Sequence, residues 1–132
     1  PEDFVIASGR METVRRFVEI SAKFLNWNTD PSKPAIIWKG EGLNEVGIRA
    51  DNNRIVVRID PRYFRPTEVN ELLGDASKAK KKLGWKPKIT LETLVEEMIN
   101  SDKQDALRES LLKEKGFKVN QSIDAFPSKR WD

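Results

Sequence analysis

Three short, largely apolar runs, each followed by turn-forming residues, constrain the fold of this chain more than any other feature. The runs are Phe4–Ala7, Ala35–Trp38 and Arg54–Ile59, and Gly or Asp-Pro lies within two residues of the end of each. Runs this short are typical of strands that are buried in a sheet, whereas helices need longer periodic segments. The sequence therefore predicts three strands that share a sheet.

The segment between the first two runs has the periodicity of a helix. Thr13 is suited to the N-cap position, and the chain reaches a cluster of turn formers at residues 28–31. One face of the predicted helix carries Val14, Phe17, Val18, Ser21, Ala22 and Leu25. The order strand, helix, strand predicts a βαβ unit with parallel strands. Residues 43–53 are predicted to be a polar connection with a turn at 51–53.

The second half of the chain predicts helices. Asp75 is suited to cap a helix over residues 76–83, and Gly84 fits the left-handed position that ends it. Thr90 is suited to cap a second helix with an apolar stripe through residue 99. A third helix is predicted from Asp102 to Gly116, and residues 120–132 are predicted to be a mobile tail.

These elements together predict a small α/β domain with short, mostly parallel strands and packed helices. The apolar faces of residues 14–25 and 91–99 are expected to form the core. Because Pro1 comes directly before a predicted strand, a natural start there is doubtful. Part of the apolar surface is then expected to be uncovered in this chain, since a preceding domain would normally pack against it.

Composition excludes several kinds of chemistry. The sequence has no cysteine and no histidine, which excludes disulfides, thiolate nucleophiles and serine–histidine triads, and no metal site is predicted. Neither a membrane span nor a secretory signal is found, so a cytoplasmic protein is expected. The net charge of +3 is only weak support for the binding of an anionic ligand. A small basic nucleic-acid-binding module remains an alternative, but basic and acidic residues are interleaved, so we expect no nucleic-acid partner.

The sequence lacks two motifs that would indicate redox catalysis, a dinucleotide-binding glycine motif and a Tyr-x-x-x-Lys motif. The Gly40-Glu41-Gly42 turn has Glu45 at the third position of a dinucleotide-binding glycine motif. Tyr63 is the only tyrosine, and Thr67 stands four residues later, where a Tyr-x-x-x-Lys motif needs lysine. We therefore predict neither catalytic nor cofactor-binding residues in this chain, and no cofactor for it alone.

Residues 58–68 combine three arginines, two prolines and an aromatic pair where a strand is predicted to end. Prolines restrict the backbone, and arginine offers a planar fork that fits phosphate oxygens. Glu68 stands three residues after Arg65 and is suited to accept hydrogen bonds from ribose hydroxyls. These features would suit a loop that binds the diphosphate and the ribose of a nucleotide. Residue chemistry alone, however, favours an ordinary charged loop.

The same segment carries a resemblance to a known family. The string RIDPRYFRPTEVNELLGDASKAKKKLGWKPKITLETLVEEM resembles the C-terminal signature of GDP-mannose 4,6-dehydratases, which are extended short-chain dehydrogenases/reductases. DFVIASGRMETVRRFVEISAKFLNW, GEGLNEVG and LLKEKGF also look like that family. The LLGD, SKA and LGW motifs indicate only the broader group of nucleotide-sugar epimerases and dehydratases. DPRYFRPTEV narrows the resemblance to the GDP-mannose enzymes.

The resemblance implies that residues 1–119 are a nucleotide-sugar-binding C-terminal domain, incomplete at its N-terminal side. A Rossmann domain absent from this chain would bind NADP and carry the catalytic residues, so this chain alone is expected to be inactive. The complete enzyme, a homo-oligomer, would convert GDP-mannose to GDP-4-dehydro-6-deoxy-mannose by an internal redox cycle with loss of water. An epimerase, dehydratase or reductase for another nucleotide sugar is the alternative.

The resemblance also implies roles for individual residues. Arg65 would contact the diphosphate of GDP-mannose, and Glu68 would contact the guanosine ribose. Arg58 and Tyr63 are weaker candidates for substrate binding, and with Arg62 they are suited to supporting the loop.

Overall fold

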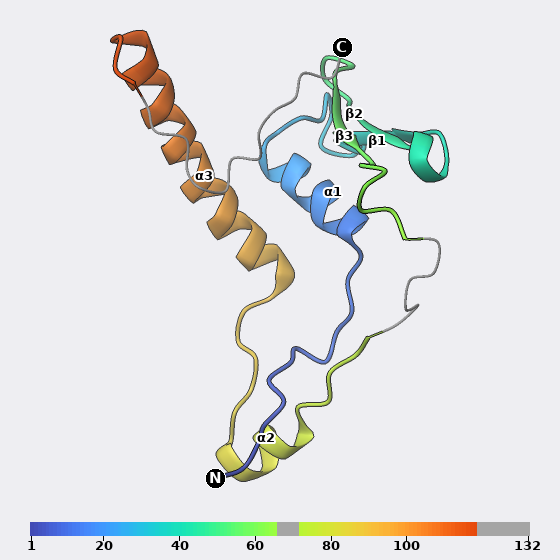
Figure 1. Ribbon diagram of the computed structural model, residues 1–132, viewed down its shortest axis with the longest axis vertical. Helices are drawn as coiled ribbons and strands as arrows, with labels where there is room; N and C mark the ends of the chain where they lie inside the picture. Colours follow the sequence, from blue (N-terminus) through green and yellow to red (C-terminus); the bar gives the residue numbers. More distant parts are fainter. Residues whose placement is uncertain (66–71, 119–132) are drawn as a thin grey trace. The chain divides into compact units, whose positions relative to one another are not determined.

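The computed structural model describes residues 1–65 and 72–118 (Figure 1). The chain divides into two compact units, Pro1–Ile99 and Asn100–Asp132, and the last helix contributes residues to both. In chain order the elements are α1 (Val14–Phe24), β1 (Ile36–Lys39), a 3₁₀ helix (Gly42–Asn44), β2 (Val46–Arg49), β3 (Ile55–Arg58), α2 (Ser77–Leu83) and α3 (Leu91–Glu114). The predicted tail at residues 120–132 lies outside the described residues, and the predicted domain boundary at residue 119 stays a prediction.

The three strands form one antiparallel sheet in the order β1-β2-β3, so the α/β class is confirmed but the prediction of mostly parallel strands is wrong. The physical reason is the length of the connections. A parallel pair needs a crossover of about a dozen residues or more, whereas residues 40–45 and 50–54 are short links that suit antiparallel neighbours. The turn predicted at residues 51–53 is confirmed within the second link, where Asn53 has a left-handed φ of 58°.

The middle strand is the element that the sequence analysis missed. β2 lies inside the stretch predicted to be a polar connection, and only its Val46 and Ile48 side chains are large and apolar. At its centre Gly47 pairs with both Trp38 and Val57. A Cβ atom on Gly47 would lie 3.0 Å from the Trp38 ring and 3.0 Å from the Val57 Cβ atom. The glycine therefore makes room for the indole over the sheet.

The first predicted strand, Phe4–Ala7, does not form, and the predicted βαβ unit is wrong with it. An apolar run becomes a strand only where a neighbouring strand supplies hydrogen-bond partners. The side chains of Val5 and Ile6 are 53% and 58% exposed, which fits the expectation that some apolar surface is uncovered. The third predicted strand does form, but Ile55 and Val56 are also exposed rather than buried.

Helix α1 begins where the sequence predicts and lies beside the sheet (Figure 1). Ala22 is buried against Ala35 and Ile36. Partly buried apolar side chains around this core come from Val18, Trp27 and Trp38. Val14, which the helical pattern also placed on the buried face, is exposed because it stands in the first turn.

The N-cap of α1 permits a test of this local structure. The Thr13 hydroxyl accepts a hydrogen bond from the Arg16 backbone N–H at 3.1 Å. We expect Thr13→Ala to lower the free energy of unfolding by about 1 kcal/mol, because one backbone donor of the first turn loses its partner. Urea denaturation followed by circular dichroism measures the change. Thr13→Ser retains the hydroxyl and is the matched control; an equal loss in both variants would contradict the capping role.

Polar contacts join α1 to the sheet as well. The Trp38 indole N–H donates to Glu19 at 3.0 Å, and the Arg15 guanidinium lies 4.4 Å from the centre of the Trp38 ring. Arg15 also pairs with Glu45, which directly precedes β2. Cation–π contacts of this kind stabilise exposed sites by about 0.5–1 kcal/mol. These contacts fix α1 against the sheet, and the last strand of that sheet, β3, leads into residues 58–68.

The helices of the second half are partly as predicted. Asp75 accepts a hydrogen bond from the Ser77 N–H at 2.8 Å before α2, and Gly84 ends that helix with a φ of 66°. Thr90 caps α3 by accepting from the Thr93 N–H at 3.2 Å. The predicted break at Asp102 is wrong, since α3 runs without interruption to Glu114. Weak helix formers at residues 100–102 do not break a helix that lacks Gly or Pro there.

Among the helices that the structure describes, none combines the length and the apolar character needed to cross a membrane.

Candidate functional site

The end of β3 leads directly into the segment that the sequence analysis selected. Arg58 is the last residue of β3 and pairs with Val46 across the sheet. The backbone then turns: the Tyr63 N–H donates to the Asp60 carbonyl at 3.1 Å, and the Phe64 N–H donates to the Pro61 carbonyl at 3.4 Å. Asp-Pro is a favourable start for such turns. The sheet therefore sets the position of Arg58, and residues 60–64 form a compact turn after it.

Arg62 and Asp60 form an ion pair within this turn. The Arg62 Nη2 atom lies 2.6 Å from one Asp60 oxygen, and the Nε atom lies 3.1 and 3.2 Å from the two oxygens. The hydrogen bond from the Arg62 side chain lowers the pKa of the Asp60 carboxyl below its usual value, so the pair stays charged to a lower pH than an isolated aspartate would allow. The Arg62 guanidinium also lies 5.6 Å from the centre of the Tyr63 ring.

The other two arginines of the segment are placed differently. Arg58 and Arg65 are both exposed, and neither forms an ion pair with any residue in the described ranges 1–65 and 72–118. Tyr63 is 65% exposed. Arg58 and Arg65, which flank the turn, are thus two exposed guanidinium groups that can donate hydrogen bonds to an anionic ligand. Glu68 lies outside the described residues, so its predicted contact with a ribose stays a prediction.

The glycine turn that follows β1 does not have the geometry of a dinucleotide-binding turn. A pyrophosphate site needs a glycine-rich turn that opens an α-helix, whose backbone N–H groups then face the phosphates. Here the Gly40-Glu41-Gly42 turn opens the three-residue 3₁₀ helix Gly42–Asn44. Within the described ranges there is also no group of three or more metal-binding side chains. The prediction that this chain contributes no catalytic centre stays a prediction.

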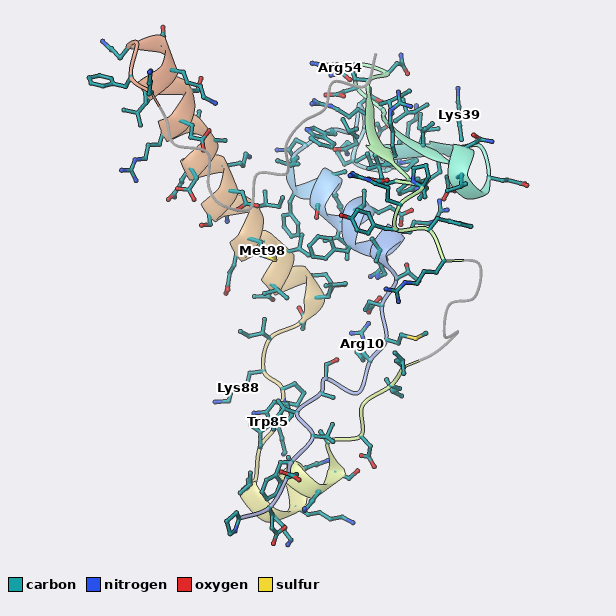
Figure 2. The ribbon with its side chains drawn as sticks, viewed as in Figure 1. Arg10, Lys39, Arg54, Trp85, Lys88 and Met98 are labelled. Carbon is teal, nitrogen blue, oxygen red and sulfur yellow. The ribbon has the colours of Figure 1, made fainter. Side chains whose placement is uncertain are left out.

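Two open pockets beside α2 were not anticipated from the sequence. Their volumes are about 550 and 750 Å³, and both are lined by residues 7–8 and by Trp85, Lys86 and Pro87. Figure 2 shows Trp85 beside α2 and the N-terminal segment, and Lys88 extending away from it. The exposed side chain of Ile6 lines the larger pocket. The pockets therefore belong to the uncovered surface around Phe4–Ala7.

Asp60 is the residue of this segment whose role the sequence analysis missed. In the sequence analysis, Asp60-Pro61 serves only as a turn-forming pair at the end of a predicted strand. The available signal was the spacing Asp-x-Arg, because an Asp side chain often accepts a hydrogen bond from the backbone two residues later. The Arg62 N–H does donate to the Asp60 carboxylate, at 3.0 Å.

Comparison with known proteins gives a consistent result. A family model described as GDP-mannose 4,6 dehydratase matches residues 1–98, which include the turn and all four predicted site residues. A GDP-mannose 4,6-dehydratase from Yersinia enterocolitica is 44% identical over 135 residues, covering 95% of this chain and 34% of that protein. One from Vibrio cholerae is 45% identical over 134 residues, covering 94% and 34%. A GDP-mannose 4,6 dehydratase from Homo sapiens is 46% identical over 102 residues, covering 77% and 26%. The chain thus spans about a quarter to a third of the length of these relatives.

Proposed function

Because this chain belongs to the GDP-mannose 4,6 dehydratase family, we propose that it supplies the part of such an enzyme that binds the GDP end of GDP-mannose. The observation that carries the proposal is the turn at the end of β3. It holds one arginine in an internal ion pair and leaves Arg58 and Arg65 exposed. Arg65 would bind the diphosphate, with Glu68 on the ribose and with Arg58 and Tyr63 in supporting roles.

The chemistry of the ligand favours this assignment. A diphosphate offers several charged oxygens, and arginine binds such groups through two parallel hydrogen bonds. The nucleotide does not react when its sugar is converted, so its binding energy can be used to orient the sugar at a catalytic centre. A substrate-binding role therefore suits a chain in which the sequence predicts no catalytic residue.

The remaining functions are proposed for other parts of the complete enzyme, by which we mean a protein of the relatives' length that contains this chain. There a Rossmann domain would bind NADP, which supplies the hydride chemistry, and would carry the acid–base residues of a lyase. The complete enzyme would act on GDP-mannose, in the cytoplasm, as a homo-oligomer. Alone, this chain would be inactive.

The proposal predicts which nucleotide sugar the complete enzyme prefers. GDP-mannose is expected to raise the Tm of the complete enzyme, because a ligand that binds only the folded state stabilises it, and does so more strongly the further its concentration exceeds its Kd. UDP-glucose and dTDP-glucose at the same concentration serve as matched controls and should leave Tm almost unchanged. A larger shift with UDP-glucose or dTDP-glucose would instead favour an epimerase or reductase for another nucleotide sugar.

A further inference from the structure

We propose that Asp60 is a positioning residue, which holds Arg62 inside the turn and thereby directs Arg65 toward the diphosphate of the ligand. The inference rests on the proposed function, since it assigns Asp60 a role in a site that binds a nucleoside diphosphate sugar. It adds a residue that carries the wrong charge to bind the ligand directly. The role of Asp60 follows from its contacts with Arg62 and Tyr63.

Asp60 makes both backbone and side-chain contacts in the turn. Its carbonyl accepts the Tyr63 N–H at 3.1 Å, and its carboxylate accepts the Arg62 N–H at 3.0 Å. The same carboxylate binds the Arg62 guanidinium at 2.6 Å. The Asp60 side chain is 23% exposed, whereas that of Arg62 is 72% exposed. One residue therefore fixes the backbone on the way to Arg65 and also one of the neighbouring guanidinium groups.

The pairing selects which arginine is available to the ligand. A guanidinium that already donates through Nε and Nη2 to a carboxylate has fewer donors left for phosphate oxygens. Arg65 has no ion pair with any residue in the part of the chain that the structure describes. The pairing also compensates the charge of Asp60, which would otherwise repel a diphosphate. Arg65, rather than Arg62, is thus the group that the turn presents.

A double-mutant cycle on the complete enzyme tests whether Asp60 acts through Arg65. Isothermal titration calorimetry with GDP gives the Kd of Asp60→Ala, Arg65→Ala and the double variant. We expect Asp60→Ala alone to weaken GDP binding about tenfold, and to have almost no further effect when Arg65→Ala is present. A general loss of stability would instead weaken binding equally in both backgrounds, and that result overturns the inference.

The cycle also separates this inference from the proposed function. If Arg65→Ala weakens GDP binding but Asp60→Ala does not, the positioning role is wrong and the proposed function stands. If Arg65→Ala leaves the Kd for GDP unchanged, both are overturned. The Tm of each variant without ligand shows whether folding is affected.

A charge-rescue experiment tests the selection of Arg65 over Arg62. Arg62→Gln leaves the Asp60 charge uncompensated and should weaken GDP binding several-fold. Adding Asp60→Asn should recover most, but not all, of the lost affinity, because the amide oxygen still accepts the backbone N–H of residue 62 and the uncompensated charge is gone, whereas the ion pair is not restored. If Arg62 itself bound the diphosphate, the double variant would remain as weak as Arg62→Gln, and the inference would be overturned.

Discussion

Arg65→Ala in the complete enzyme is expected to weaken GDP-mannose binding about 10- to 100-fold, because hydrogen bonds to charged groups contribute roughly 1.5–3 kcal/mol each. The substitution removes an exposed guanidinium three residues beyond the Asp60–Arg62 pair. Isothermal titration calorimetry measures the Kd, and steady-state kinetics should show that KM rises more than kcat falls. Such a division is the sign of a lost contact that is made about equally in the ground state and in the transition state.

Two further variants make this result specific. Arg65→Lys keeps the positive charge but loses the planar fork, so an intermediate Kd is expected. Arg54 is an exposed arginine that directly precedes the first residue of β3, at the other end of this strand from Arg58 (Figure 2). Arg54→Ala is therefore the matched control for net charge. An equal loss of affinity in Arg54→Ala and Arg65→Ala would show that only overall charge matters, and it would refute the assigned site.

Gly40→Ala is expected to have the largest effect on stability, about 2 to 5 kcal/mol in the free energy of unfolding. Gly40 directly follows β1 and has a φ of 84°, and an added Cβ atom would lie 2.3 Å from the Asn44 carbonyl oxygen. That oxygen belongs to the backbone of the 3₁₀ helix that leads into β2, so it cannot move aside without shifting the strand. Urea denaturation of the complete enzyme gives the change.

Gly84→Ala is the matched control for the backbone conformation alone. Gly84 has a similar φ of 66°, but no described atom lies within 4 Å of the position that its Cβ would occupy. Its substitution should therefore cost only about 1–2 kcal/mol, the cost of the left-handed conformation. If both variants lose the same stability, the close approach of Gly40 and Asn44 has no energetic consequence.

The predictions that succeeded depend on short stretches of sequence. Thr13 and Thr90 cap α1 and α3, and Gly84 ends α2, because capping involves only residues within one helical turn. The turn at residues 51–53 is equally local. The roles of Arg58 and Arg65 in the candidate site stay predictions, although the chemistry of these residues and the neighbouring prolines are visible in the sequence.

The predictions that failed depend on partners distant in the sequence. Phe4–Ala7 has the pattern of a strand but has no neighbouring strand among the described residues. β2 has a weak pattern and forms because β1 and β3 pair with it on both sides. The Asp60–Arg62 pair was missed for a related reason: the sequence shows both charges but not their orientation.

That ion pair also affects how the ligand approaches the protein. Residues 58–65 contain three arginines and one aspartate, so this segment carries a net charge of +2 rather than +3. A diphosphate in solution is attracted by this net field at distances up to about 10 Å at moderate ionic strength. Added salt would therefore slow the encounter as expected for two positive charges, and the number of arginines would overestimate the sensitivity of the association rate to salt.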